Sequence, residues 1–297
     1  MANLYTQASK NVTKTWLLMT LVFLLVIALG WFFSIYFQNP GILIFFSIFA
    51  IALNIVAYWY SDRVVIKLSG ARPATREEFF DLYTVVENLS ITAGLPMPKI
   101  FVVEDSAPNA FATGRDKNHA VICATTGLLA ILNRTELEGV IAHELSHIGN
   151  RDMLVSTVVV VLVGFISIVS DMFMRSFLWG GRRNNKDGES GSVLVIIGIV
   201  LAVLAPLIGT LIQLAISRKR EYLADASGAL LTRYPEGLAS ALEKIGRNSE
   251  PLLHQSNAIA HLYIADPTGG KKTAWYKTLF MTHPPISDRV RALVGNK

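Results

Sequence analysis

The sequence predicts a mainly α-helical membrane protein with four transmembrane helices and a cytoplasmic α+β domain that contains a small antiparallel sheet. Three observations carry this prediction. Hydrophobic residues make up 52% of the 297-residue chain and charged residues only 16%, whereas soluble domains hold about a quarter charged residues. The apolar residues gather in four runs, each long enough to cross a bilayer. Outside these runs the chain has the mixed composition and turn signals of a soluble domain.

Residues 1–62 are predicted to form an N-terminal transmembrane hairpin. Trp16 to Phe37 is free of charged residues, and a turn at 38–41 leads into a second apolar run from Ile42 to about Tyr60. A signal peptide is the competing interpretation of the first run, but its apolar core would be shorter and would end at small residues. Basic residues flank both outer ends of the hairpin and none lies at its tip, so both ends are expected in the cytoplasm.

Residues 63–152 are predicted to be the first part of the soluble domain. A helix is expected from about 75 to 89, because Thr75 and Glu78 have the spacing of a capping box and apolar residues follow at helical intervals. Two parts of this segment have the β-branched and aromatic content of strands. They are residues 96–104 and the pair 109–114 and 119–125, which is expected to form two antiparallel strands.

The next helix can begin at either of two caps, Asn133 or Thr135, since a glutamate lies three residues after each. A third apolar run, Met153 to about Met174, follows almost at once. The helix that ends before it is therefore expected to continue or turn straight into a spanning helix.

Residues 153–217 are predicted to form a second transmembrane hairpin, with a polar linker at 175–192 and a fourth apolar run from Val193 to Ile216. The linker holds four basic and two acidic residues. A full crossing would place those basic residues outside, against the positive-inside tendency. Incomplete insertion of both runs is the alternative. We expect full crossing because both runs are long enough.

Residues 218–297 are predicted to complete the soluble domain. They begin with the basic cluster Arg218-Lys219-Arg220, and Pro235 to Lys244 has helical periodicity with a proline near its start. Because a membrane hairpin brings both its ends to one side, this part can pack against residues 63–152.

Net charge and cysteine content narrow the range of possible functions. The net charge is +5 and the pI is near 9.3, but the basic residues lie largely beside apolar blocks, where they set topology, so no nucleic-acid partner is expected. The single cysteine, Cys123, excludes an intrachain disulfide framework.

The motif His143-Glu144-Leu-Ser-His147 carries the clearest chemical signal. Residues four apart on a helix lie on one face, so His143 and His147 can present imidazole nitrogens to one metal ion. Glu144 would lie close enough to act on a metal-bound water without being a ligand. Zinc suits such a site because it accepts nitrogen and oxygen ligands and keeps one position open.

Such a zinc site needs a third protein ligand. Glu221 and Asp225 follow the fourth apolar run and share a face if this segment is helical. By themselves they would be taken for a solvated face paired with basic neighbours. With the histidine motif present, Glu221 becomes the candidate third ligand, because the second hairpin would bring it to the side of His143 and His147.

The segments His143–His147 and Glu221–Asp225 together resemble the gluzincin metallopeptidases of the HtpX type. These are heat-shock-associated integral membrane zinc proteases of bacteria and archaea, related to the CAAX prenyl proteases. The resemblance covers nearly the whole chain. Further matching segments are the N-terminal hairpin, Asn109-Ala110-Phe111-Ala112, Ser217-Arg218, His283-Pro284-Pro285 and Arg289.

The resemblance implies a zincin-like metalloprotease domain with one Zn²⁺ on His143, His147 and Glu221. Its setting would be a multi-pass protein of the prokaryotic plasma (inner) membrane with a cytoplasmic active site. Glu144 would take a proton from the attacking water and pass it to the leaving amine.

The resemblance also implies roles around the metal. Asp225 would orient His143 by accepting its second N–H, and Arg289 would hold Asp225. His283 would donate to the tetrahedral oxyanion, or it would only cap the last helix. The stretch Asn109 to Ala112 would be the strand edge on which an extended substrate lies, or a purely structural strand.

We therefore expect a membrane-bound zinc endopeptidase that cleaves misfolded or damaged membrane proteins on their cytoplasmic side, in protein quality control and stress response. Its partners would be membrane-protein or peptide substrates and the lipid bilayer. Homo-oligomerisation stays open.

Three other functions remain as alternatives. Intramembrane proteolysis of the site-2 type is disfavoured, because Arg134, Glu136 and Glu138 make the motif helix too polar for lipid. Prenyl-protein processing would need more than four spanning helices. A non-proteolytic membrane chaperone or scaffold with a structural zinc site would need a fourth protein ligand, such as His283.

Overall fold

The structure is a computed structural model that describes residues 4–165, 218–248, 251–252, 259–265 and 284–295. Several sequence predictions fall outside these residues. They are the fourth apolar run, the linker at 175–192, the far half of the third run, and His283.

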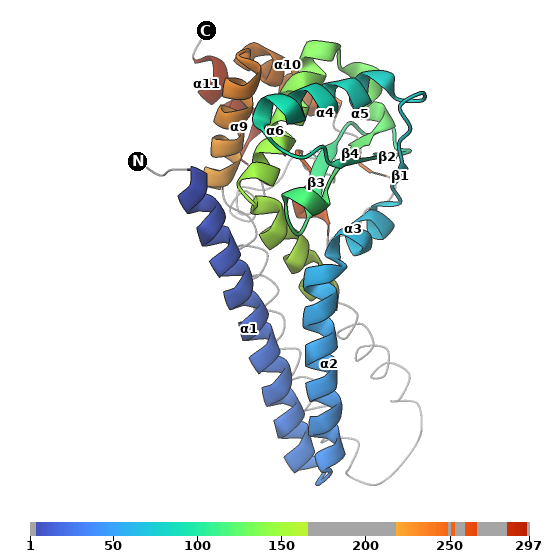
Figure 1. The fold of residues 1–297 in the computed structure, drawn as a ribbon, viewed down its shortest axis with the longest axis vertical. Coiled ribbons are helices and arrows are strands. Elements are labelled where there is room, and N and C mark those ends of the chain that lie inside the picture. Colours follow the sequence, from blue (N-terminus) through green and yellow to red (C-terminus); the bar gives the residue numbers. More distant parts are fainter. Residues whose placement is uncertain (1–3, 166–217, 249–250, 253–258, 266–283, 296–297) are drawn as a thin grey trace.

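The N-terminal hairpin consists of α1 (Leu4–Tyr36) and α2 (Pro40–Trp59), which run side by side away from the rest of the protein (Figure 1). Asn39 caps α2 by accepting a hydrogen bond from the backbone N–H of Gly41 at 2.9 Å. Within the described residues, these two helices are long and apolar enough to cross a membrane. Their most apolar 18-residue stretches have mean hydropathies of 2.5 and 2.3. The two predicted apolar helices are therefore present side by side, their crossing of a membrane stays a prediction, and α1 begins well before its apolar run.

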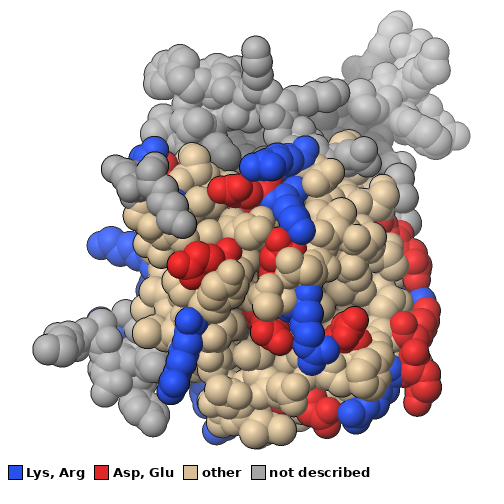
Figure 2. Space-filling view, turned by 90° about the horizontal axis from the view of Figure 1, so that it is seen from above, with Lys and Arg blue, Asp and Glu red and all other residues tan. Residues whose placement is uncertain are grey.

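The soluble part alternates short helices and strands. Its elements are α3 (Ser61–Ser69), β1 (Arg72–Pro73), α4 (Phe80–Ala93), β2 (Lys99–Val103), β3 (Ala110–Gly114), η1 (Lys117–His119), β4 (Ala120–Thr125), α5 (Thr126–Ile131) and α6 (Arg134–Gly149), followed by α9 (Arg218–Thr232), α10 (Pro235–Arg247), η2 (Ala260–Leu262) and α11 (Ile286–Val294). In space-filling view, the surface opposite the hairpin carries basic and acidic side chains among one another, as a face in water does (Figure 2).

The described strands form one four-stranded sheet in the order β1-β2-β4-β3. β3 and β4 pair antiparallel, with Phe111 opposite Cys123, which confirms that predicted pair. The prediction of a wholly antiparallel sheet is wrong, because β2 and β4 are parallel, with Phe101 also opposite Cys123. After β2 the chain passes over one strand position and forms β3. It then returns as β4, which lies between β2 and β3.

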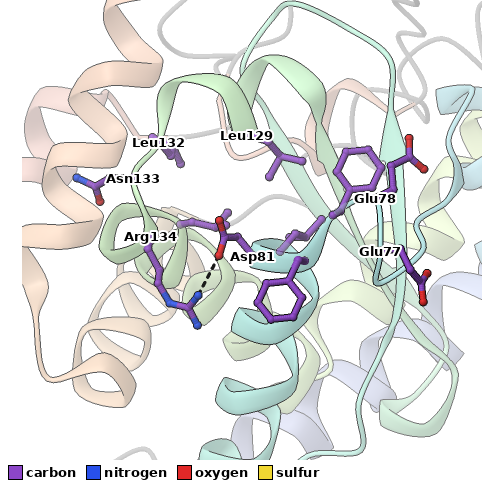
Figure 3. A pocket seen from close by; sticks show the side chains of 11 residues that line it. Glu77, Glu78, Asp81, Leu129, Leu132, Asn133 and Arg134 are labelled. Atoms are coloured by element: carbon purple, nitrogen blue, oxygen red, sulfur yellow. Dashed lines mark hydrogen bonds and ion pairs between the residues drawn. The ribbon is translucent and has the colours of Figure 1, made fainter.

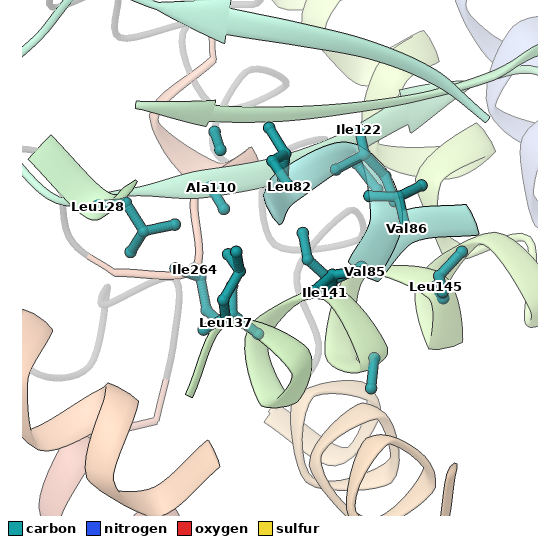
Figure 4. Close-up of a cluster of buried hydrophobic side chains, with 14 of the residues drawn as sticks. Leu82, Val85, Val86, Ala110, Ile122, Leu128, Leu137, Ile141, Leu145 and Ile264 are labelled. Atoms are coloured by element: carbon teal, nitrogen blue, oxygen red, sulfur yellow. The ribbon is translucent and has the colours of Figure 1, made fainter. Parts of the chain in front are cut away.

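Both faces of the sheet are buried, because alternate residues of each strand point to opposite sides. On one face, Ile122 and Ala110 pack with side chains of α4 and α6, including Leu82 and Ile141 (Figure 4). On the other face, Phe111 and its neighbours form a second cluster. The sheet thus holds β3 beside α6.

Local capping explains where the helices begin. Asn133, not Thr135, caps α6, and its capping box with Glu136 is complete. The helix predicted from about 75 exists, but α4 begins at Phe80. Glu78 does not close a capping box, because its carboxylate is held by Arg72.

At the end of α6 the chain turns by 81° into a helix that is described over Asp152–Phe165. Arg151 occupies the turn in a left-handed conformation (φ 56°). The following helix packs its valines and leucines against α1 and α2 in one apolar cluster. The predicted turn of the motif helix straight into an apolar helix is confirmed for these residues.

Candidate metal centre

Two histidines of α6 face one point. His143 is buried and His147 nearly so, and their Nε2 atoms lie 3.2 Å apart. Two nitrogens bound to one zinc at about 2.0–2.1 Å in tetrahedral geometry would be roughly 3.3 Å apart. The spacing of the pair therefore fits a shared metal ion.

Glu221 comes from the first turn of α9. Its Oε2 lies 3.8 Å from His143 Nε2 and its Oε1 lies 3.7 Å from His147 Nε2. One ligand atom from each of the three residues lies within 4.8 Å of the others. Two imidazoles and a carboxylate are the donor set of catalytic zinc sites that keep a position open, so these residues fit the zinc that the sequence predicts.

The approach of α9 to α6 depends on Gly228. A Cβ at this position would lie 2.9 Å from the backbone N of His143. The two helices are therefore in direct backbone contact at His143 itself, two turns of α9 after Glu221, and this contact brings Glu221 to the histidines.

Glu144 lies beside the three ligands and is 2% exposed. Burial raises the pKa of its carboxyl group to about 7, although the charges of His147 and Arg289 and a hydrogen bond from the backbone N–H of Ala112 oppose the rise. A carboxyl group with a pKa near neutrality can both accept and return a proton.

His143 is held from behind by a buried ion pair. Its Nδ1 lies 2.9 Å from Asp225 Oδ1. Arg289, fully buried, donates to both oxygens of Asp225, at 2.8 and 2.6 Å. Burial alone would raise the pKa of Asp225, but the hydrogen bonds from Arg289 and His143 outweigh it and lower the pKa to about 2. Burial lowers the pKa of His143, and this favours the neutral imidazole.

His147 has a carboxylate partner that the sequence did not reveal. Its Nδ1 lies 3.3 Å from Asp152 Oδ2. Burial lowers the pKa of His147, but the hydrogen bond to Asp152 and the charges of Glu221, Asp152 and Glu144 raise it to about 9 in the absence of metal. The one feature of the sequence that could have indicated this partner is the position of Asp152 immediately before an apolar run.

Asn109 lies just before β3 and Ala110 to Ala112 lie on it, at the edge of the described sheet, and all four residues are buried. Part of this edge is already paired. The Asn109 amide donates to Ala265 O at 3.1 Å, and Ile264 N–H donates to Ala110 O at 2.9 Å. Arg289 in turn donates to Ile264 O at 3.0 Å.

A surface pocket of about 340 Å³ lies elsewhere, among the starts of α4 and α6 and the end of α5 (Figure 3). Its lining includes the ion pair of Arg134 and Asp81 at 3.0 Å and the cap residue Asn133. None of the three metal-cluster residues lines it. We connect no chemistry with this pocket.

Comparison with known proteins agrees with this geometry. Peptidase family M48 matches residues 76–297. A "Protease HtpX homolog" of Caldanaerobacter subterraneus subsp. tengcongensis is 48% identical, over 98% of this chain and 97% of the relative. One from Tropheryma whipplei (strain Twist) is 44% identical, over 99% of each.

Among solved structures, the crystal structure of S. mikatae Ste24p has a similar fold, with a TM-score of 0.50 and 17% identity. The match covers 93% of this chain and 62% of Ste24p, so this chain spans less than two thirds of that protein. A family match over most of the chain and relatives of this identity establish membership. The chain belongs to peptidase family M48 and is a membrane metalloprotease.

Proposed function

We propose that this metalloprotease is a zinc-dependent endopeptidase that cleaves misfolded or damaged membrane proteins in segments exposed on the cytoplasmic side. One observation carries the proposal: a His143, His147 and Glu221 cluster with Glu144 beside it, at the junction of α6 and an apolar helix. Asn11, near the start of the candidate span Ala8–Tyr36, reaches this junction. A peptide bond cleaved at this site would lie close to the bilayer surface.

Each residue of the site would have a separate role in catalysis. His143, His147 and Glu221 hold zinc, which when bound supplies a Lewis acid that lowers the pKa of water and polarises the scissile carbonyl. Glu144 accepts the proton of the attacking water and delivers it to the leaving amine. Asp225 fixes His143 in the tautomer that directs Nε2 to the metal.

Two further roles remain part of the proposal. An extended substrate would lie along the edge of β3, where it would have to replace two hydrogen bonds, from the Ile264 N–H to the Ala110 carbonyl and from the Ala112 N–H to Glu144. Since Asn109 to Ala112 are buried, the chain that covers them would have to move aside. His283 would donate to the oxyanion.

Topology is proposed as multi-pass in a prokaryotic plasma membrane, with residues 63–152 and 218–297 as the two parts of a cytoplasmic catalytic domain and 153–217 as a second hairpin. A Lys186→Cys variant tests it in intact cells, since Cys123 is buried. Labelling by a membrane-impermeant reagent added outside is expected. Protection from that reagent would contradict the second crossing.

The catalytic proposal is tested by Glu144→Gln, measured as cleavage of quenched-fluorescent peptides by the zinc-loaded full-length protein in detergent. Cleavage should fall by at least about a hundredfold, the contribution of a general base, while bound zinc stays at one per chain. The matched control is Glu138→Gln on the same helix, whose carboxylate pairs with Arg134. Undiminished proteolysis by Glu144→Gln would refute the mechanism.

A further inference from the structure

Three segments converge on Asp152, the first residue of the helix after α6. Its side chain is 6% exposed. One carboxylate oxygen, Oδ2, lies 3.3 Å from His147 Nδ1. The other, Oδ1, accepts a hydrogen bond from Asn11 Nδ2 at 2.6 Å and lies 3.7 Å from Arg220 Nε of α9. The carboxylate thus joins a candidate zinc ligand to the N-terminal membrane helix.

Asn11 is an unusual residue for its position. It lies near the start of the candidate span of α1 and is 2% exposed. A buried amide is costly unless it is hydrogen-bonded. Its Nδ2 donates to Asp152 and also to the backbone oxygen of Asn150, at 3.0 Å. Both N–H groups of the Asn11 side-chain amide therefore donate to residues of the turn that follows His147.

The two metal histidines differ in what holds them. The carboxylate behind His143, Asp225, is fixed by Arg289 from α11, within the catalytic part. The carboxylate behind His147 is fixed by α1, which belongs to the membrane hairpin. The sequence distance from Asn11 to Asp152 is 141 residues.

We propose that Asn11 and Asp152 are positioning residues for His147, so that the position of the N-terminal membrane helix α1 sets the geometry of the metal site. This inference rests on the proposed function only in taking His147 as a zinc ligand. A carboxylate that accepts the Nδ1–H of a ligand histidine fixes its tautomer and ring orientation, with Nε2 left for the metal. Asn11 holds that carboxylate, and it acts on the metal through Asp152.

A purely structural role predicts something different. Asp152 opens a helix, where a carboxylate stabilises the exposed N–H groups. If capping were its whole contribution, its loss would lower stability and leave zinc affinity unchanged in the folded protein. Zinc affinity, not melting temperature, therefore separates the two roles.

The test uses full-length protein in lipid nanodiscs, with the variants Asn11→Ala, Asp152→Asn and the double variant. The zinc dissociation constant is measured by competition with a chromophoric chelator, and the visible spectrum of bound Co²⁺ reports ligand geometry. Metal-free melting temperatures identify any variant that does not fold. Thr15→Val is the matched control, since Thr15 is buried on the same helix and its hydroxyl donates to Asn11 O.

Asp152→Asn should weaken zinc binding by about 10- to 100-fold, the usual effect of losing such a partner. Asn11→Ala should weaken it in the same direction and alter the Co²⁺ spectrum, whereas Thr15→Val should bind as the unmodified protein does. Because Asn11 acts through Asp152, the double variant should bind no more weakly than Asp152→Asn.

Wild-type zinc affinity in folded Asn11→Ala, or losses that multiply in the double variant, would overturn the inference. If Asp152→Asn does not fold, Asn11→Ala and its Co²⁺ spectrum still decide the question. Peptide cleavage is scored separately. A protein that binds zinc but cuts no peptide would refute the proposed function and leave this inference standing.

Discussion

Gly228 is the position at which α9 rests directly on the backbone of α6, and its replacement by alanine should weaken metal binding. The new Cβ would lie 2.9 Å from His143 N and 3.2 Å from Ala142 C. Ordinary contacts between such atoms begin at about 3.5 Å, so the helices must separate by roughly 0.6 Å. Both neighbouring atoms belong to the backbone, which cannot rotate away.

This separation reaches Glu221, which lies two helical turns before Gly228 on α9. Metal ligands tolerate deviations of only about 0.2 Å, so zinc affinity should fall by about tenfold or more. The fold should survive. Overpacking costs about 1–3 kcal/mol, and alanine recovers about 1 kcal/mol of helix propensity relative to glycine.

Two other glycines of α6 provide matched controls for the zinc competition assay. A Cβ at Gly149 meets nothing within 4 Å, so Gly149→Ala should not lower stability and should leave zinc binding unchanged. A Cβ at Gly139 would lie 2.7 Å from the backbone N of Leu238 on α10, which carries none of the three ligands. Gly139→Ala should destabilise the fold and leave zinc affinity intact. Wild-type zinc affinity in folded Gly228→Ala would refute the reasoning.

Other predictions concern the charges around the ligands. Arg289→Met leaves the buried Asp225 without its arginine partner, which costs about 3–5 kcal/mol and should lower the melting temperature by about 6–20 °C. Adding Asp225→Asn should restore part of the lost melting temperature, and no recovery would contradict the pairing. The metal-free protein should melt at lower temperature as pH rises from 7 to 9, because the folded-state pKa values of Glu144 and His147 are both raised, so the native state binds more protons than the unfolded chain, while the lowered pKa of His143 acts in the opposite sense only at lower pH. His147 contributes stability that is present below pH 6.5 and lost as pH rises through about 9. Zinc binding at pH 8 should release about one proton from His147, measured by calorimetry in buffers of different ionisation enthalpy; a heat independent of the buffer would contradict the raised pKa.

The histidine pair could be predicted from sequence because its information is local. His143 and His147 are four residues apart on one helix, whereas Glu221, in the first turn of α9, became a candidate only because a second hairpin would bring it to the histidines. Apolar patterning likewise predicted the hairpin of α1 and α2. In each case, one helical period or one run of residues contains the whole signal.

The remainder depends on long-range packing that local patterns do not encode. The β-branched and aromatic content of β2 and β4 predicts strands but not their order, so the parallel pair was missed. Asn11 lies ahead of an apolar run, and its partner Asp152 is 141 residues away, so no local pattern connects them. Glu78 had the spacing of a capping box, but Arg72 took its carboxylate.

The most direct test of the central claim is zinc K-edge X-ray absorption on the purified full-length protein. One zinc per chain is expected, with scattering from two imidazoles and from oxygen ligands at about 2.0–2.2 Å. The Glu221→Gln variant should lose zinc affinity or show a changed oxygen shell. A third imidazole, or sulfur at about 2.3 Å, would contradict a site built from His143, His147 and Glu221 with one position left open.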